Sequence, residues 1–104
     1  MKNKLIAYLG FAKKSGKLSS GEQIALEKIK ESKAKIVFLA SDASQNTAKR
    51  IRDKAGYRGI RVCEELNRQE LGKAIGQEER VVVCINDRGF AAAICKVLEG
   101  EQDG

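Results

Sequence analysis

Ile36-Val37-Phe38-Leu39-Ala40 is an uninterrupted apolar run near the middle of the chain, and it decides the fold class. A strand that is covered on both faces has this composition, because neither of its faces meets water. Val81-Val82-Val83-Cys84-Ile85 is a second run of the same kind. The two runs therefore predict central strands of a sheet that has helices on both sides.

Helical and strand patterns alternate around these two runs. We expect short strands at residues 18–19 and 60–63, and helices over residues 3–14, 21–32, 47–55, 67–75 and 87–98. Ser20 and Gln23 have the spacing of a capping box for the second helix, in which Ile24 is expected to be buried with Ala25 and Ile29. Gly56 is expected to end the third helix. The alternation predicts an α/β fold, with residues 1–104 as a single domain: a three-layer α/β/α sandwich with a mixed sheet of about four strands and a frayed tail at 100–104.

Charge is divided unevenly along the chain. The first 61 residues hold 15 of the 20 Lys and Arg residues and five acids, whereas residues 62–104 hold five bases and nine acids, so +10 and −4 give the net +6. A basic face on a small domain attracts polyanions.

The turn from Ser15 to Gly21 leads into a helix N-terminus, which suits phosphate. RNA binding is the first hypothesis. The rival is a protein-interaction module whose basic face docks an acidic partner of the ribosome or the transcription machinery.

Residue types that carry catalysis are scarce. The chain has no histidine, and Cys63, Cys84 and Cys95 form no CxxC pair, which removes most of the familiar zinc and acid–base sites without excluding an enzyme. An enzyme is therefore the third hypothesis, and we expect no catalysis, no metal, no cofactor and no small-molecule substrate. No apolar run approaches the roughly 20 residues of a membrane span, and no leader segment opens the chain. We therefore expect a cytoplasmic protein that does not contact a membrane and is a monomer when free.

Three segments in series resemble a known family. They are the turn Ser15–Gly21, the stretch Lys33–Asp42 with its Ala-Lys-strand-Ala-x-Asp pattern, and Glu70–Gly76 with its Leu-Gly-x-Ala-x-Gly pattern. In this order they resemble the kink-turn RNA-binding ribosomal-protein family of the L7Ae and L30e type, and within it the small bacterial YlxQ-like members. The resemblance covers about residues 3–98. It implies an α/β/α sandwich that binds sharply bent internal-loop RNA, is associated with the ribosome, and has ribosomal RNA as one candidate partner.

The resemblance also implies two RNA-binding elements, which are the start of the second helix and the loop that follows Gly76. The backbone N–H groups at that helix start are expected to face phosphate. Ile24 and Glu27 stand where many members have an acid and a lysine, so we expect weaker discrimination between a kink-turn and other bent loops. The candidate RNA-binding residues are Gly21, Glu22, Gln23, Ile24 and Glu27 in the first element, Gln77, Glu78, Glu79 and Arg80 in the second, and Lys14, Lys17, Ser20 and Lys28 beside them.

Overall fold

The computed structural model describes residues 1–100. The frayed tail expected at residues 100–104 therefore lies, apart from Gly100, outside the described residues. Helices and strands alternate along the chain as the sequence predicted. Their order is α1 (Lys2–Lys14), β1 (Leu18–Ser20), α2 (Glu22–Lys30), β2 (Ile36–Leu39), α3 (Gln45–Tyr57), β3 (Arg61–Cys63), α4 (Arg68–Ala74), β4 (Val82–Ile85) and α5 (Arg88–Leu98).

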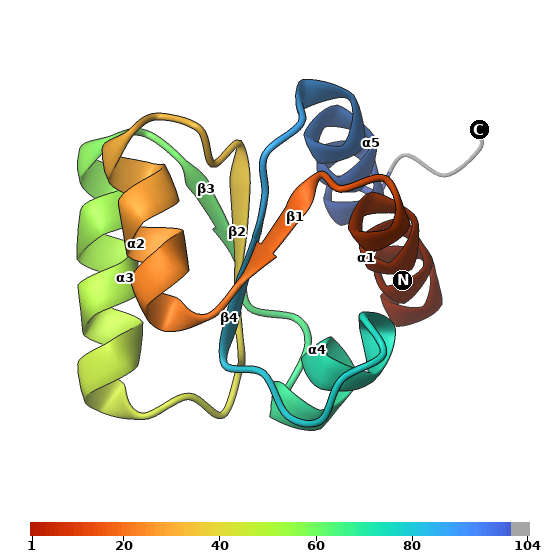
Figure 1. Cartoon of the computed structure of the whole chain (residues 1–104), viewed down its shortest axis with the longest axis horizontal. Helices are drawn as coiled ribbons and strands as arrows, with labels where there is room; N and C mark the ends of the chain where they lie inside the picture. The colour runs from red at the N-terminus through yellow and green to blue at the C-terminus, as the bar shows by residue number, and fades with distance from the viewer. Residues whose placement is uncertain (101–104) are drawn as a thin grey trace.

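The four strands form one mixed sheet in the order β1-β4-β2-β3. β2 is parallel to β3 and antiparallel to β4, with Phe38 opposite Val83, and β4 is in turn antiparallel to β1. Every residue of β2 and β4 is buried, which confirms that the two apolar runs are the central strands. β1 and β3 form the edges of the sheet, and β1 lies in front in Figure 1.

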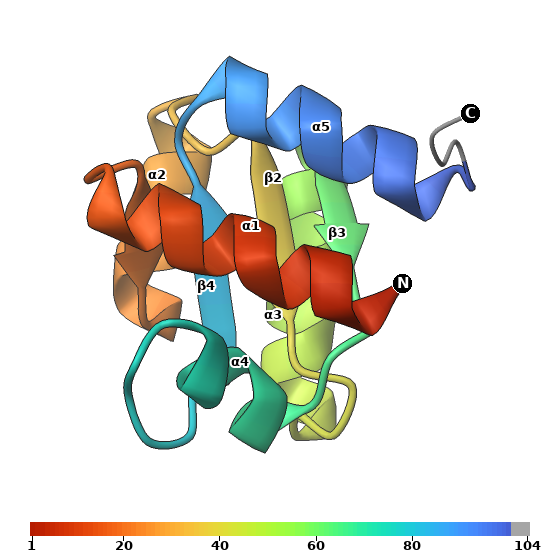
Figure 2. The same cartoon turned by 90° about the vertical axis from the view of Figure 1, so that its right-hand side faces the viewer.

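Helices cover both faces of this sheet, so the predicted three-layer sandwich is confirmed (Figures 1 and 2). Successive strand residues point to opposite faces and build two separate cores. Ala25, Ile29 and Ile51 of α2 and α3 pack with Val37, Leu39, Val82 and Cys84 on one face. Residues of α1, α4 and α5 pack on the other face with Ile36, Phe38, Val83 and Ile85. No helix among residues 1–100 combines the length and the apolar character that a membrane span requires.

Two expectations about helix ends were wrong. Ser20 does not cap the second helix, because it pairs with Val83 as the last residue of β1, and Gly21 occupies the cap position instead. Gly56 does not end α3, which continues to Tyr57, because the left-handed turn is made later by Gly59 at φ 69°. Asn67, the first residue of the expected fourth helix, is the N-cap of α4, and it forms a reciprocal capping box with Glu70.

The expected burial of Ile24 was also wrong. Its side chain is 46% exposed. Ala25 and Ile29, four residues apart, form the buried stripe of α2, and Ile24 lies about 100° around the helix from that stripe. The start of α2 therefore presents an apolar side chain to solvent within the region where the sequence predicted RNA.

Candidate nucleic-acid interface

The N-terminus of α2 lacks a side-chain cap. Gly21, at φ 114° and ψ 146°, donates its own N–H to the carbonyl oxygen of Val82 at 2.9 Å, so this N–H does not face a ligand as expected. No side chain among the described residues accepts from the first-turn N–H groups of Glu22, Gln23 and Ile24. Uncapped N–H groups at the positive end of a helix dipole bind anions. Because Ser20 pairs with β4 and does not cap α2, these three N–H groups remain available to a ligand.

Arg80 joins the two candidate elements. Its Nε donates to Ser20 Oγ at 3.0 Å, one Nη donates to the backbone carbonyl of Glu79 at 2.9 Å, and the other donates to Gln77 Oε1 at 3.2 Å. The first of these bonds links the α4–β4 loop, residues 75–81, to the end of β1 just before α2. The structure therefore places the start of α2 beside the α4–β4 loop, although about 60 residues separate them in sequence.

The backbone of the α4–β4 loop packs directly against Gly72. The N–H of Gln77 donates to the Gly72 carbonyl at 2.8 Å. A Cβ built on Gly72 would lie 1.5 Å from the carbonyl oxygen of Glu78 and 3.0 Å from the Cα of Glu79. Any side chain at position 72 would therefore push the loop backbone away from α4. Gly72 was not among the predicted site residues, although the Leu-Gly-x-Ala-x-Gly pattern that contains it was recognised.

Two of the candidate acids have cationic partners. Glu22 accepts a hydrogen bond from Thr47 Oγ1 at 3.2 Å and forms an ion pair with Arg50, so it faces α3. Glu79 lies 3.9 Å from a guanidinium nitrogen of Arg68. Glu78 has no ion pair within residues 1–100. The negative charge that the sequence placed beside the expected phosphates is thus partly neutralised by neighbouring arginines.

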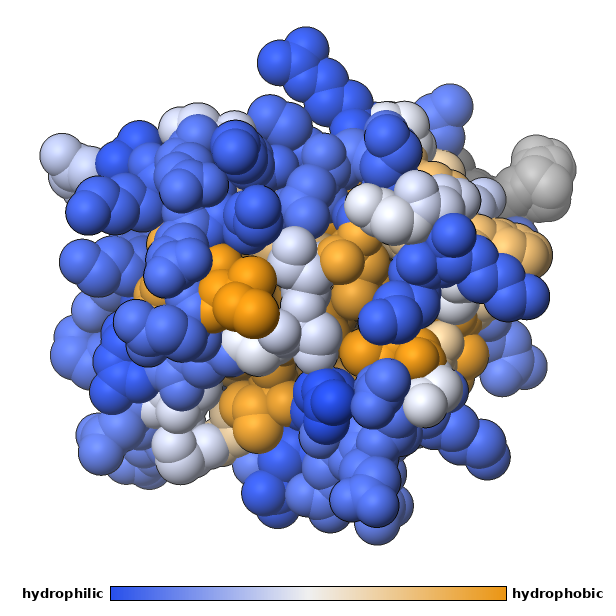
Figure 3. Space-filling view, viewed as in Figure 1, coloured by the Kyte–Doolittle hydropathy of each residue, from blue (hydrophilic) through white to orange (hydrophobic). Residues whose placement is uncertain are grey.

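The candidate lysines are spread over a wider surface. Lys28 is half-buried on α2. Lys14 and Lys17 lie at the other end of β1, where the N–H of Asn86 donates to the Lys17 carbonyl at 2.9 Å. Figure 3 shows the face over β1, α2 and α1, where hydrophilic side chains surround several exposed apolar ones. Lys14 and Lys17 precede β1 and Gly21 follows it, so the two lysines lie at the opposite end of this strand from the start of α2.

The basic helix α3 carries less free charge than its sequence indicates. Lys49 is paired with Asp53 at 2.9 Å, Arg50 with Glu22, and Arg52 with Glu64 through two hydrogen bonds of 2.9 and 2.6 Å. An exposed ion pair lowers the charge available to a polyanion, whereas Lys28 and Lys30 in the last turn of α2 have no ion pair within the described residues. The free positive charge therefore lies on the second half of α2 rather than on the first half of α3.

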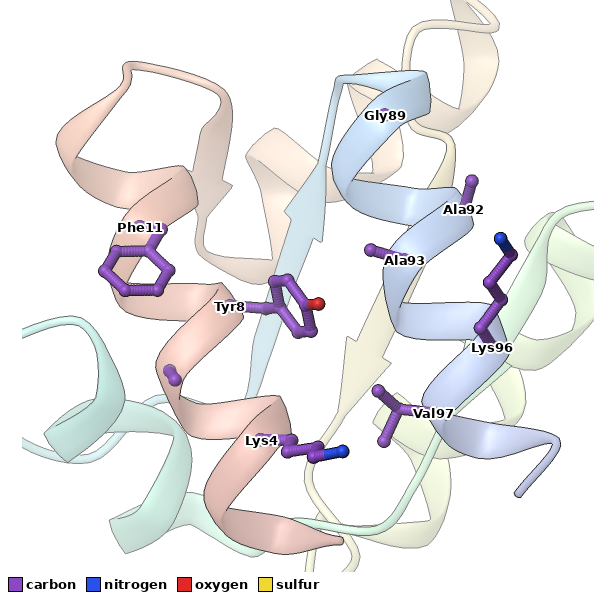
Figure 4. Close-up of a pocket in the computed structure, with 9 residues that line it drawn as sticks. Lys4, Tyr8, Phe11, Gly89, Ala92, Ala93, Lys96 and Val97 are labelled. Carbon is purple, nitrogen blue, oxygen red and sulfur yellow. The ribbon is translucent and has the colours of Figure 1, made fainter. Parts of the chain in front are cut away.

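One groove of the surface is lined by none of the candidate RNA-binding residues. A groove of about 680 Å³ lies between α1 and α5, and Figure 4 shows Tyr8 directed into it. Lys4 and Lys96 are the charged residues of its lining, and no acidic side chain lies among the lining residues. Burial raises the pKa of the Cys84 thiol to about 11, which keeps it protonated and unreactive. No cluster of metal-ligating side chains occurs among residues 1–100.

Comparisons with known proteins agree with the resemblance noted in the sequence. Residues 3–96 match the model of the family described as "Ribosomal protein L7Ae/L30e/S12e/Gadd45 family". The RNA-binding protein YlxQ of Bacillus subtilis is 41% identical over 88% of this chain and 91% of its own, and YlxQ of Enterococcus faecium is 36% identical over 95% of each. A Bacillus halodurans protein of unknown function has a TM-score of 0.87 at 35% identity, covering 90% of this chain and 95% of that one.

A more distant solved structure shares the fold. The Giardia lamblia 15.5 kD RNA-binding protein has a TM-score of 0.81 at 19% identity, covering 92% of this chain and 85% of its own. At this identity the likeness concerns the arrangement of helices and strands. The family recognised in the sequence is confirmed by the family model over residues 3–96 and by the two YlxQ relatives.

Proposed function

This chain belongs to the ribosomal protein L7Ae/L30e/S12e/Gadd45 family, and we propose that it is a non-catalytic protein that binds structured RNA. Two relatives that match most of its length are named RNA-binding proteins. The observation that carries the proposal is the uncapped start of α2, which the Arg80–Ser20 hydrogen bond holds beside the α4–β4 loop. Together these elements present donors for phosphate and amide groups for bases on one exposed edge.

The chemistry of this edge suits an RNA internal loop. The N–H groups of Glu22, Gln23 and Ile24 would bind a phosphate, because they lie at the positive end of the α2 dipole without a side-chain cap. The exposed amide of Gln23 can pair with a base edge. The Gln77 amide oxygen is held by Arg80, which leaves its NH₂ group to donate. Duplex RNA offers few accessible base edges, so the partner is an internal loop in which bases and phosphates are splayed apart.

We further propose that this RNA is sharply bent, as in a kink-turn, and that the protein acts on ribosomal or other structured RNA in the cytoplasm. Ile24 and Glu27 replace the acid and the lysine that many members of the resembled family carry. Discrimination between a kink-turn and another bent loop should therefore be weak. Ile24→Glu combined with Glu27→Lys should sharpen it, as measured by the ratio of the two Kd values. An unchanged ratio would show that these positions do not read the RNA.

Fluorescence anisotropy with two labelled hairpins tests the proposal. One hairpin has an asymmetric internal loop with tandem G·A pairs, and the other has an uninterrupted stem of the same length. We expect Arg80→Ala to weaken binding of the first hairpin at least tenfold, because the α4–β4 loop loses its attachment to β1. Arg88→Ala is the matched control, since Arg88 is exposed and has no ion pair within residues 1–100; it should change Kd less than about twofold.

A second variant tests the helix N-terminus itself. Gly21→Val should abolish binding, because its branched side chain would stand before the phosphate donors. The positive φ of Gly21 also strains any side chain there, so circular dichroism must confirm that the variant is folded. Gln23→Ala avoids this strain and should reduce binding without loss of fold. Equal Kd values for the two hairpins, or stronger competition by polyglutamate than by RNA, would instead support the docking of an acidic protein.

A further inference from the structure

The outer surfaces of α2 and α3 form a second groove, which we call the α2–α3 groove. It is lined by Gln23, Glu27, Lys30, Lys54, Tyr57 and Arg58, over an apolar floor from Leu26 and Ile29, and has a volume of about 520 Å³. The two helices lie side by side in the outer layer of the molecule (Figure 1). Because Gln23 and Glu27 also belong to the candidate RNA-binding set, the groove continues the proposed site along α2.

Tyr57 is the unusual residue of this groove. Its side chain is 86% exposed, the highest value among the exposed large hydrophobic residues of the described chain. The Arg58 guanidinium lies 6.0 Å from the centre of its ring and also donates to Ser32 Oγ at 3.3 Å. An exposed aromatic ring beside an arginine is a stacking surface for an unpaired base. Duplex RNA cannot use it, because the faces of paired bases are already covered.

The charge of the groove is positive and unneutralised. Lys30, Lys54 and Arg58 have no ion pair within residues 1–100, and Glu27 is the one acid of the lining. The bases on the first half of α3 are each ion-paired, as described above. Free cations thus gather around the exposed ring. A strand that stacks a base on Tyr57 would find these cations beside its phosphates.

We propose that the α2–α3 groove binds an unpaired nucleotide of an RNA strand that extends beyond the internal loop. The base stacks on Tyr57, and the flanking phosphates contact Lys30, Lys54 and Arg58. The volume is ample for one nucleotide. This inference rests on the proposed RNA-binding function for the identity of the strand, but the groove can be tested without it.

The first test uses hexaadenylate alone. The chain has two tyrosines and no tryptophan, so Tyr8→Phe leaves Tyr57 as the single source of tyrosine fluorescence. We expect hexaadenylate to quench this fluorescence in a salt-dependent manner. Lys54→Ala should weaken the quenching. Lys49→Ala is the matched control, because Lys49 lies on the same helix but is paired with Asp53, and it should leave quenching unchanged. Absence of quenching, equal effects of the two variants, or displacement of hexaadenylate by hexaglutamate would overturn the inference.

The second test compares the internal-loop hairpin with the same hairpin carrying a six-nucleotide unpaired extension at either end. Of the two extended hairpins, the one that binds more tightly should exceed the affinity of the unextended hairpin roughly 5- to 100-fold, which is the gain expected from stacking one base. Tyr57→Ala should remove the gain and leave the unextended hairpin unaffected, whereas Tyr57→Phe should keep it. Equal losses for both hairpins would show a merely structural role and overturn the inference. If the unextended hairpin binds and the extension adds no affinity, this inference fails and the proposed function stands. If hexaadenylate quenches the Tyr57 fluorescence but neither hairpin binds, the proposed function fails and this inference stands.

Discussion

Gly72→Ala tests how the α4–β4 loop is held. The added Cβ would lie 1.5 Å from the Glu78 carbonyl oxygen and 2.4 Å from its carbonyl carbon. Both are backbone atoms, so no change of rotamer relieves the contact. The loop must move by nearly 2 Å to restore ordinary van der Waals separation, and the 2.8 Å hydrogen bond from the Gln77 N–H to the Gly72 carbonyl is strained or lost.

The expected change in the free energy of unfolding has three contributions, of which two destabilise the variant and one stabilises it. Forcing one methyl group into a close-packed contact costs about 1–3 kcal/mol, and the better helix propensity of alanine returns up to about 1 kcal/mol. Loss of the hydrogen bond adds about 1 kcal/mol. We therefore expect Gly72→Ala to lower the free energy of unfolding by about 1–3 kcal/mol. For a domain of this size each kcal/mol lowers Tm by about 4–8 °C.

Gly56→Ala is the matched control for this prediction. Gly56 also lies in a helix, but a Cβ there has no heavy atom within 4 Å, so the same change should stabilise the protein by about 0.5–1 kcal/mol. Equilibrium urea unfolding measures both values. At a temperature where all variants are folded, Gly72→Ala should also weaken hairpin binding at least tenfold, and Gly56→Ala should not. Equal stabilities for the two variants would refute the packing argument, and unchanged RNA affinity of Gly72→Ala would refute the role of the loop.

Three further predictions concern charge and protonation. Replacing Lys14 and Lys17 together by Ala should flatten the slope of log K against log salt by about one to two units without changing the fold, and an unchanged slope would remove both residues from the interface. The N–H of Asn67 holds the pKa of Glu70 below its ordinary value of 4.5, so the stability that this carboxylate contributes is present above pH 4.5 and is lost as pH falls through its lowered pKa. Glu70→Gln should therefore reduce the acid sensitivity of unfolding as pH falls below 4.5, and identical pH profiles would contradict this. Cys84 is buried and protonated, so iodoacetamide at pH 8 should modify it only in molecules that have transiently unfolded. Its rate of modification should therefore be much lower in buffer than in urea, where the protein is unfolded, and equal rates would contradict this.

The sheet and its two helical layers could be predicted because their signals are local. The apolar runs around Phe38 and Val83 identify strands buried on both faces wherever their partners lie in the sequence. The capping box of α4 was equally predictable, because Asn67 and Glu70 form both of its hydrogen bonds within four residues. Such elements depend on the composition and spacing of a short segment.

The geometry of the candidate site depends on partners that are remote in sequence. Ser20 had a partner for capping three residues away, but pairing with β4 placed it in a strand, where its hydroxyl accepts from Arg80. Glu22 was predicted as part of the RNA-binding element, and the fold directs its carboxylate to Arg50, 28 residues further along the chain. Neither contact has a pattern that a single sequence can show. The sequence could therefore indicate which segments matter but not how they meet.

A titration of ¹⁵N-labelled protein with the internal-loop hairpin tests the central claim most directly. The claim is that RNA contacts the uncapped start of α2 and the α4–β4 loop together. The largest changes in amide chemical shift should occur at residues 22–24 and 77–80, with smaller changes along α2, and the uninterrupted hairpin should produce neither. Shifts centred on the groove between α1 and α5, or on the first half of α3 without the α4–β4 loop, would contradict the account.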